Sequence, residues 1–427
     1  MSLAPYALDK GTVTSAVDTL AAFRETFRSP ILRRTVAVLA IILGLLAVGS
    51  RSTSLGAADL TRNDFTLDYA SAKALLHGND PYDSMSHLVH YLGANAPYYE
   101  PPEFDSRSVH PPFHIAIVTP LTALPYRVAR IIWLLLMAGC SGLAVGMLIR
   151  TLGVSRRWSV VTGIGVLALP IFQKDLVYGQ SNGLLLLLLV LAWHSLKKDS
   201  QRAAGLSLGI AAAVKLFPVL MVVPLIRERR WRALGWMVGT AAVLSAAGAL
   251  AVGITASREF IKPATSANFA FWRAAPMNLS LPGVAYRWLT RSRWRPLGLN
   301  LPSVAAVLAF ALIALCIVAM FKTPSRLSGR YWATMPLLLL ATPLVWDNYL
   351  VLIAPILIAG VIGSSNRVLV MISLAVLAIG IPPGLPSPPP LVPDVAQVLG
   401  YALPTYALIV VAASEWRRDR AEPVYSV

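Results

Sequence analysis

The chain of 427 residues contains few charged side chains. Only 13% of its residues are Asp, Glu, Lys or Arg, whereas soluble domains contain about 25%. Acidic residues are the scarcest, with 20 against 37 Lys and Arg. Hydrophobic residues make up 56% of the chain, and the mean hydropathy is +0.64. This composition excludes an ordinary soluble domain and predicts an all-α polytopic membrane protein.

Several chemistries have no support in the sequence. Its two cysteines, Cys140 and Cys316, both lie in apolar runs, so neither a disulfide framework nor a cysteine metal site is expected. The chain has no phosphate-binding loop of ATPases, no His-Glu-x-x-His and no Gly-x-Ser-x-Gly motif. ATP hydrolysis, zinc proteolysis and serine hydrolysis are therefore not indicated. We expect no metal and no cofactor.

The net charge of +17 does not indicate a nucleic-acid partner. The basic residues form short clusters between apolar runs such as 36–48, 183–193 and 350–362. That spacing is typical of cytoplasmic loops between membrane spans, which also contact anionic lipid headgroups. Residues 1–34 are polar and carry acids, so the first apolar run is expected to be a retained span rather than a cleaved signal.

Counting spans between the basic clusters predicts about twelve, with both termini in the cytoplasm. The expected spans are 35–50, 128–149, 158–172, 182–196, 203–214, 216–226, 233–254, 302–321, 329–345, 348–364, 367–382 and 397–413. A single transmembrane domain, 35–413, then lies between a cytoplasmic segment, 1–34, and a cytoplasmic tail, 414–427. Its long outer loops are 51–127 and 255–300, and a short third one begins at 173–178.

Two segments do not fit this path simply. Residues 111–125 are apolar enough to span, but counting them would place every later basic cluster outside. We therefore expect an amphipathic or re-entrant element against the outer leaflet. Residues 203–226 have basic flanks at both ends, which favours a short hairpin with residues 215–218 at its outer apex.

Polar residues gather in the first outer loop, which holds eight of the twenty acids and five of the six histidines. Asp64 and Asp68 are four apart, so on a helix both carboxylates would share one face. Such a pair could deprotonate a hydroxyl group; a solvated loop helix would give the same spacing. His110 begins a His-Pro-Pro-Phe-His segment. It could donate to a phosphate, or the segment could simply start a helix.

Later polar residues occur at the end of an apolar run, within an apolar hairpin and in the second outer loop. Gln180 and Asn182 could bond sugar hydroxyls or cap a helix. Lys215 lies within an apolar hairpin and needs an anionic partner, either a lipid phosphate or an Asp, unless it reaches the interface. Arg273 and Arg287 place positive charge outside, which favours phosphate binding or headgroup contact.

Two further motifs lie on the outer side, one in a loop and one at a span boundary. Asn278 begins an Asn-Leu-Ser-Leu-Pro-Gly segment in the second outer loop. Trp346, Asp347 and Asn348 lie between two apolar runs. An aromatic belt explains Trp346, but it does not explain Asp347, which is the only acid between Glu259 and Asp394.

In this order the motifs resemble glycosyltransferase family 87, whose members have the GT-C fold and use polyprenyl-phosphate sugars. The matching segments are 64–70, 80–83, 110–113, 179–182, 215–218, 278–280 and 343–346. The resemblance implies a membrane module whose first outer loop carries juxtamembrane helices. It also implies a catalytic Asp, which falls on Asp64. From its spacing we expect Asp68 to support Asp64 in catalysis.

The resemblance further implies an inverting transferase without a metal, in the plasma membrane with its active site outside. The donor would be a polyprenyl-phosphate sugar, with mannose favoured over arabinofuranose, and the acceptor an envelope glycolipid or polysaccharide. Donor-phosphate ligands would be Lys215, Arg273, Arg287 and His110. Sugar or acceptor ligands would be Gln180, Asn182, Asn278, Trp346, Asp347 and Asn348.

One motif departs from the family, because several members carry a His pair where this chain has Asp347 and Asn348. This departure keeps a non-catalytic partner of another transferase open as an alternative. A lipid-linked-sugar flippase and a solute transporter also stay open, because both need many spans and cations within the membrane. A transporter usually shows internal repeats, and none is visible in this sequence.

Overall fold

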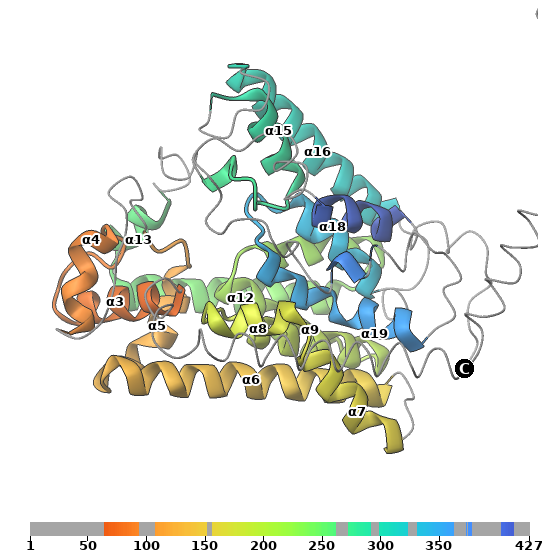
Figure 1. Cartoon of the computed structure of the whole chain (residues 1–427), viewed down its shortest axis with the longest axis horizontal. Helices are drawn as coiled ribbons and strands as arrows, with labels where there is room; N and C mark the ends of the chain where they lie inside the picture. Colours follow the sequence, from red (N-terminus) through yellow and green to blue (C-terminus); the bar gives the residue numbers. More distant parts are fainter. Residues whose placement is uncertain are drawn as a thin grey trace, which may run out of the picture.

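The computed structural model describes residues 64–93, 107–151, 156–261, 272–291, 299–322, 331–362, 373, 375–377 and 403–413. Regular structure in these ranges is entirely helical (Figure 1), so the prediction of an all-α protein is confirmed for them. The expected first span, 35–50, and the expected cytoplasmic segments, 1–34 and 414–427, lie outside the described residues.

The helices follow the labels of Figure 1. They are α3 (Asp64–Leu76), α4 (Met85–Leu88), η1 (Val89–Leu92), α5 (Pro112–Val118), η2 (Thr119–Ala123), α6 (Tyr126–Thr151), α7 (Arg156–Leu167), α8 (Pro170–Val177), α9 (Asn182–Lys197), α10 (Gln201–Val214), η3 (Phe217–Met221), α11 (Val222–Arg227), α12 (Trp231–Val252), α13 (Ile254–Ile261), α15 (Leu281–Leu289), α16 (Pro302–Lys322), η5 (Tyr331–Ala333), α18 (Thr334–Ala341), η6 (Asp347–Ile353) and α19 (Ala354–Ile362).

Three of these helices are long and apolar enough to cross a membrane: α6, α12 and α16. Local signals set their ends. Proline begins α16 at Pro302 and a cation ends it at Lys322, while α12 stops at Gly253, whose φ of 93° is easy only for glycine. The three helices coincide with the predicted spans 128–149, 233–254 and 302–321. The count of twelve stays a prediction.

The predicted span 158–172 is bent. Helices α7 and α8 meet at 55° and count as one crossing only if the bent pair is a single span. The break falls directly before Pro170, which lacks an N–H and starts the new helix. We expected an outer loop to begin at residue 173, but α8 continues to Val177. Residues 173–177 are therefore helical, and the chain changes direction before Pro170 instead of at residue 173.

The predicted interruption near Lys215 is present. Helix α10 ends at Val214, Lys215 has an extended backbone (φ −142°, ψ 137°), and η3 begins at Phe217 with Pro218 in its first turn. The extended residue turns the chain before α11. Lys215 is only 3% exposed despite its charge.

Glycines allow two of these helices to pack closely. A Cβ at Gly205 would lie 2.3 Å from the Ala233 carbonyl oxygen, and one at Gly209 would lie 2.6 Å from that of Met237. Small residues of this kind bring helix backbones together in membrane proteins. Helix α12 thereby packs against α10 over much of its length.

Figure 1 shows α3, α4, α5 and α13 together at one end of α6 and α12. Gly248 of α12 contacts the backbone of Phe113 in α5. The expected element at 111–125 thus consists of α5 and η2, held against a long helix. Its position relative to a membrane surface stays a prediction.

Candidate active site

Backbone and ring contacts fix the start of α3. The N–H of Asp64 donates to the Tyr178 carbonyl oxygen at 2.8 Å. Phe65 stacks on Trp133 of α6 at 5.4 Å between ring centroids, and the Trp133 indole N–H donates to the Gly179 carbonyl oxygen at 2.7 Å. Helix α3 is therefore joined both to α6 and to the turn that follows α8.

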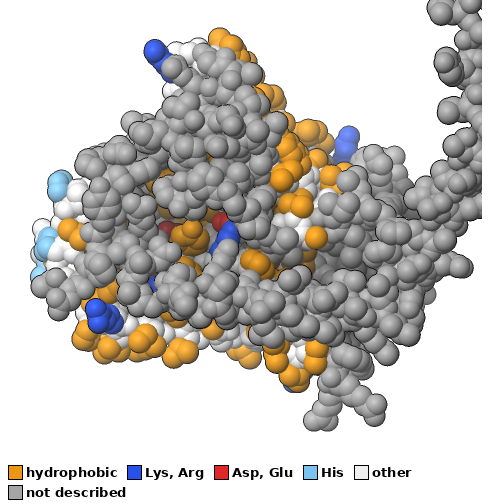
Figure 2. Space-filling view, viewed as in Figure 1, with side chains coloured by type: hydrophobic (Ala, Val, Ile, Leu, Met, Phe, Trp, Pro, Cys, Tyr) orange, Lys and Arg blue, Asp and Glu red, His pale blue; other side chains and the backbone are white. Residues whose placement is uncertain are grey.

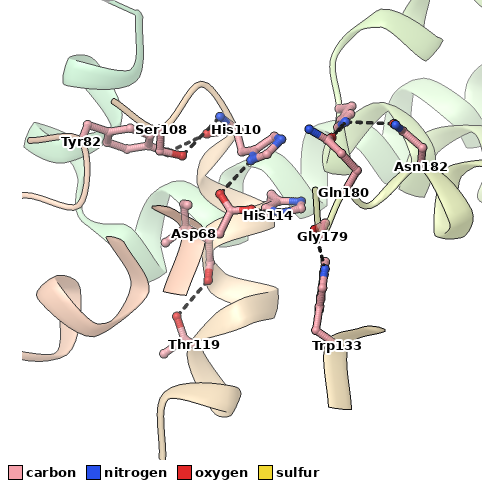
Figure 3. Close-up of polar contacts among 12 residues, drawn as sticks. Asp68, Tyr82, Ser108, His110, His114, Thr119, Trp133, Gly179, Gln180 and Asn182 are labelled. Carbon is pink, nitrogen blue, oxygen red and sulfur yellow. Dashed lines mark hydrogen bonds and ion pairs between the residues drawn. The ribbon is translucent and has the colours of Figure 1, made fainter. Parts of the chain in front are cut away.

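Asp68, one turn further along α3, is tightly paired. It is 1% exposed, and its two carboxylate oxygens lie 2.7 Å from His110 Nδ1 and 3.0 Å from His114 Nε2 (Figure 3). Burial alone would raise the pKa of Asp68, but His110 and His114, which contact both of its carboxylate oxygens, hold it well below the usual range. Asp68 is therefore ionised at neutral pH.

Asp64 is in the opposite situation. Its side chain is half-buried, and within the described part of the chain its carboxylate makes no hydrogen bond or ion pair. Burial and the negative charge of Asp68 raise the pKa of Asp64 to about 7, while the charge of Lys215 acts in the other direction. A carboxylate with this pKa exchanges its proton near neutral pH, as a general base must.

The two histidines come from the His-Pro-Pro-Phe-His segment. Their rings lie 4.2 Å apart, and His114 also packs edge-on against Trp133. With Asp68 they have the residue types of a metal site, with ligand atoms within 4.8 Å of one another. The distances of 2.7 and 3.0 Å also satisfy both carboxylate oxygens through imidazole N–H donors alone.

Lys215 is held by amide groups. Its ammonium donates to Gln180 Oε1 at 2.6 Å and to Asn182 Oδ1 at 2.9 Å, and it lies 4.2 Å from the centroid of the Tyr349 ring. Among the described residues no carboxylate forms an ion pair with it. A neutral cradle of this kind keeps the positive charge available to an anion from outside.

Asp175 is a buried residue that we did not predict. It is 1% exposed, and its Oδ1 accepts from Asn182 Nδ2 at 2.8 Å. This bond turns the amide oxygen of Asn182 toward Lys215. The second carboxylate oxygen of Asp175 has no hydrogen bond in the described ranges. An acid in an apolar stretch is the available signal, whereas the sequence predicts the start of an outer loop at residues 173–178.

The predicted segment at residues 346–349 lies next to this cradle. Asp347 forms an ion pair with Lys174 of α8, a partner absent from our predictions. The Asn348 carbonyl oxygen accepts from Asn182 Nδ2 at 3.4 Å. Trp346 is half-buried and packs edge-on against Trp272. The structure thus brings this segment to the cradle through backbone and ion-pair contacts.

Asn278 connects two loops. Its amide nitrogen donates to the carbonyl oxygens of Arg273 and Pro343, each at 2.9 Å. Its amide oxygen accepts from the backbone N–H groups of Ser280 at 3.2 Å and Val345 at 3.0 Å. All four partners belong to the backbone. The side chain thus holds the loops together, and its sugar-binding role stays a prediction.

The two predicted arginines lie beside these loops. Arg287 is fully buried and donates to the carbonyl oxygens of Ala275 at 2.8 Å and Asn278 at 2.6 Å. The Arg273 guanidinium lies 3.4 Å from the centroid of the Tyr286 ring. Their roles at a donor phosphate stay predictions, because no hydrogen bond within the described ranges joins either arginine to the Lys215 cradle.

A half-buried, unpaired carboxylate, Asp64, therefore lies within electrostatic reach of a buried cation, Lys215, in a helical membrane protein. On the face that Figure 2 shows, a few acidic and basic side chains adjoin one another among hydrophobic ones. These are the elements of a group-transfer site: a base for a hydroxyl and a cation for an anionic leaving group. The family model for glycosyltransferase family 87 matches residues 109–345, more than half of the chain. The protein belongs to this family.

Two curated relatives are similar to the chain. Both are named polyprenol-phosphate-mannose-dependent alpha-(1-2)-phosphatidylinositol pentamannoside mannosyltransferase. The one from Mycolicibacterium smegmatis is 26% identical over 287 residues, which are 66% of this chain and 66% of the relative, slightly less than two thirds. The one from Mycobacterium tuberculosis is 27% identical over 336 residues, 77% of this chain and 73% of the relative. No solved structure matches significantly.

Proposed function

We propose that this protein is an inverting glycosyltransferase of the plasma membrane, which moves mannose from a polyprenyl-phosphate carrier to a glycolipid or polysaccharide on the extracytoplasmic side. Family membership and the names of the two relatives support the donor. The observation that carries the proposal is the contrast on α3, where Asp68 is paired by two histidines and Asp64 is left unpaired.

In the proposed reaction Asp64 accepts the proton of an acceptor hydroxyl. The hydroxyl oxygen then forms a bond to the anomeric carbon of the donor, on the side opposite the phosphate. The bond between that carbon and the phosphate oxygen breaks, and its electron pair leaves with the polyprenyl phosphate. One displacement inverts the anomeric configuration and requires no covalent intermediate. A pKa of about 7 for Asp64 suits this role.

Lys215 is the favoured partner of the donor phosphate. Its ammonium has three N–H donors, of which Gln180 and Asn182 occupy two. The third can point to a phosphate oxygen, where the positive charge stabilises the leaving group as negative charge develops. Asp175 does not contact Lys215 in this scheme; it accepts a hydrogen bond from the Asn182 amide and so orients the amide oxygen that binds Lys215.

The experiment uses the purified full-length protein in lipid nanodiscs, with labelled polyprenyl-phosphate mannose and phosphatidylinositol mannosides as acceptors. We expect wild-type transfer and a loss of about 100-fold or more in Asp64→Asn. Asp83→Asn is the matched control, because Asp83 is half-exposed and its carboxylate contacts just His87 and Ser84 among the described residues. Polyprenyl-phosphate arabinofuranose serves as a second donor. Full activity of Asp64→Asn would remove Asp64 from the mechanism.

Product analysis tests inversion separately. The anomeric configuration of the new glycosidic bond, read by nuclear magnetic resonance, should be opposite to that of the donor. Retained configuration would contradict a single displacement. Movement of the intact lipid-linked sugar across the bilayer without transfer would instead favour a flippase.

A further inference from the structure

His110 has one ring nitrogen engaged and the other free. Its Nδ1 lies 2.7 Å from the ionised carboxylate of Asp68, so we assign the proton of a neutral ring to Nδ1. Nε2 then carries a lone pair. Within the described part of the chain the hydrogen bonds of His110 involve its backbone and Nδ1 and none involves Nε2, and the side chain keeps 8% exposure.

The surroundings keep this ring uncharged. Burial lowers the pKa of His110 to about 4, and the nearby cation Lys215 and the ring of His114 act in the same direction, although Asp68 opposes them. His114 lies against one side of the ring at 4.2 Å, and Figure 3 shows Gln180 across from His110. His110 is therefore a fixed neutral acceptor near the Lys215 cradle.

A phosphate is a poor match for such a nitrogen. Phosphate oxygens are acceptors, and so is the lone pair of Nε2, whereas a hydroxyl group brings the hydrogen atom that Nε2 lacks. This chemistry differs from our sequence-based expectation of a phosphate ligand at this position. Sugars are dense in hydroxyl groups, and both substrates of the proposed reaction carry them.

We propose that His110 accepts a hydrogen bond from one sugar hydroxyl through Nε2, and that it thereby determines specificity for the substrate. The proposal rests on the function proposed above and deepens it. The hydroxyl belongs either to the transferred sugar or to the acceptor sugar. Asp68 is the positioning residue, since it holds Nδ1 and thus the direction of Nε2.

Two substitutions separate the two ring nitrogens. His110→Asn keeps an N–H donor near Asp68 but removes the acceptor at the Nε2 position. His110→Gln places an amide oxygen near the Nε2 position and should restore part of the function. The matched control is His114→Gln, because His114 uses Nε2 toward the same carboxylate and Gln keeps a donor there.

The measurement compares parent substrates with analogues that lack single hydroxyls, first in the donor and then in the acceptor. The wild type should disfavour one deoxy analogue by about 10- to 100-fold in kcat/KM. His110→Asn should lose that discrimination for the same analogue, and His114→Gln should keep it. The series that responds identifies whether the hydroxyl belongs to donor or acceptor.

Three results would overturn the proposal. The first is unchanged discrimination in His110→Asn against every deoxy analogue. The second is weaker inhibition of His110→Asn by sugar-free polyprenyl phosphate, which would make His110 a phosphate ligand. The third is a stoichiometric metal ion in the purified protein that is lost in His110→Asn, since a metal would occupy Nδ1. Absence of wild-type transfer would instead refute the function, so the two failures are distinguishable.

Discussion

Asp64 and Asp68 lie one helical turn apart on α3, and their carboxylates have opposite environments. Two imidazoles hold Asp68 in its ionised form, and the resulting negative charge helps to raise the pKa of Asp64. Neighbouring carboxylates with separated pKa values are typical of sites that divide binding and proton transfer between two acids. The pair thus supplies a permanent anion and a proton acceptor.

The activity should depend on pH through Asp64. Because the pKa of Asp64 is raised to about 7, its protonated and inactive form prevails below pH 7. We expect kcat/KM to rise about tenfold per pH unit up to that value and to level off above it. Asp83→Asn should follow the wild-type profile. A flat profile between about pH 5 and 8 would contradict Asp64 as the base.

Replacing Lys215 should weaken binding of the donor. Lys215→Gln removes a cation that is 3% exposed, and a charged hydrogen bond is worth about 1.5–3 kcal/mol. We expect the donor KM to rise about 10- to 100-fold. The pH at which activity rises should also shift to a higher value, because Lys215 lowers the pKa of Asp64 in the wild type. Lys198→Gln, at the exposed end of α9, is the control. An unchanged donor KM would argue for a purely structural lysine.

Asn278 should matter for stability more than for substrate affinity. Asn278→Ala removes four hydrogen bonds to backbone groups, although the Pro343 carbonyl oxygen keeps the Ser280 hydroxyl as a donor, and we expect a loss of about 3 kcal/mol. Thermal unfolding in detergent measures the effect, with Asn79→Ala as the exposed control. A selective rise in KM at wild-type stability would favour the predicted sugar contact instead.

Gly183 should not tolerate a side chain. A Cβ there would lie 2.6 Å from both the Met137 carbonyl oxygen and Ser141 Oγ, where α9 meets α6. Gly183→Ala should therefore cost about 1–3 kcal/mol of stability. Gly235→Ala in α12 has open space around it and should be neutral or slightly stabilising. Equal melting temperatures for the two variants would contradict this close contact.

Local signals explain what the sequence predicts well. Apolar runs bounded by charge, proline or glycine predict α6, α12 and α16, and the isolated charge of Lys215 marks the break after α10. The bend at Pro170 was missed because 158–172 is apolar enough to resemble one straight span. Pro170 has no N–H to continue the helical hydrogen bonds, so the helix breaks there although the hydropathy is that of one span.

The site was only partly predictable, because its pairs are distant in sequence. Asp68 meets His110 and His114 across 42 and 46 residues, and spacing alone could not assign one carboxylate to the histidines and leave the other unpaired. Lys174 escaped prediction for the same reason, because its partner Asp347 is 173 residues away. Asp175 is only seven residues from its partner Asn182, but the sequence predicts the start of a loop at residues 173–178, where an acid is unremarkable.

The bond from the Asp64 N–H to the Tyr178 carbonyl oxygen places the helix start independently of the side chain at position 64. Asp64→Ala should therefore leave the start of α3 in place, with a small cavity where the carboxylate was. Added formate could enter this cavity and act as the base in place of the missing carboxylate. Chemical rescue of Asp64→Ala by formate, but not by chloride, would reveal that cavity. Failure of formate at any concentration would mean that the cavity closes when the carboxylate is removed.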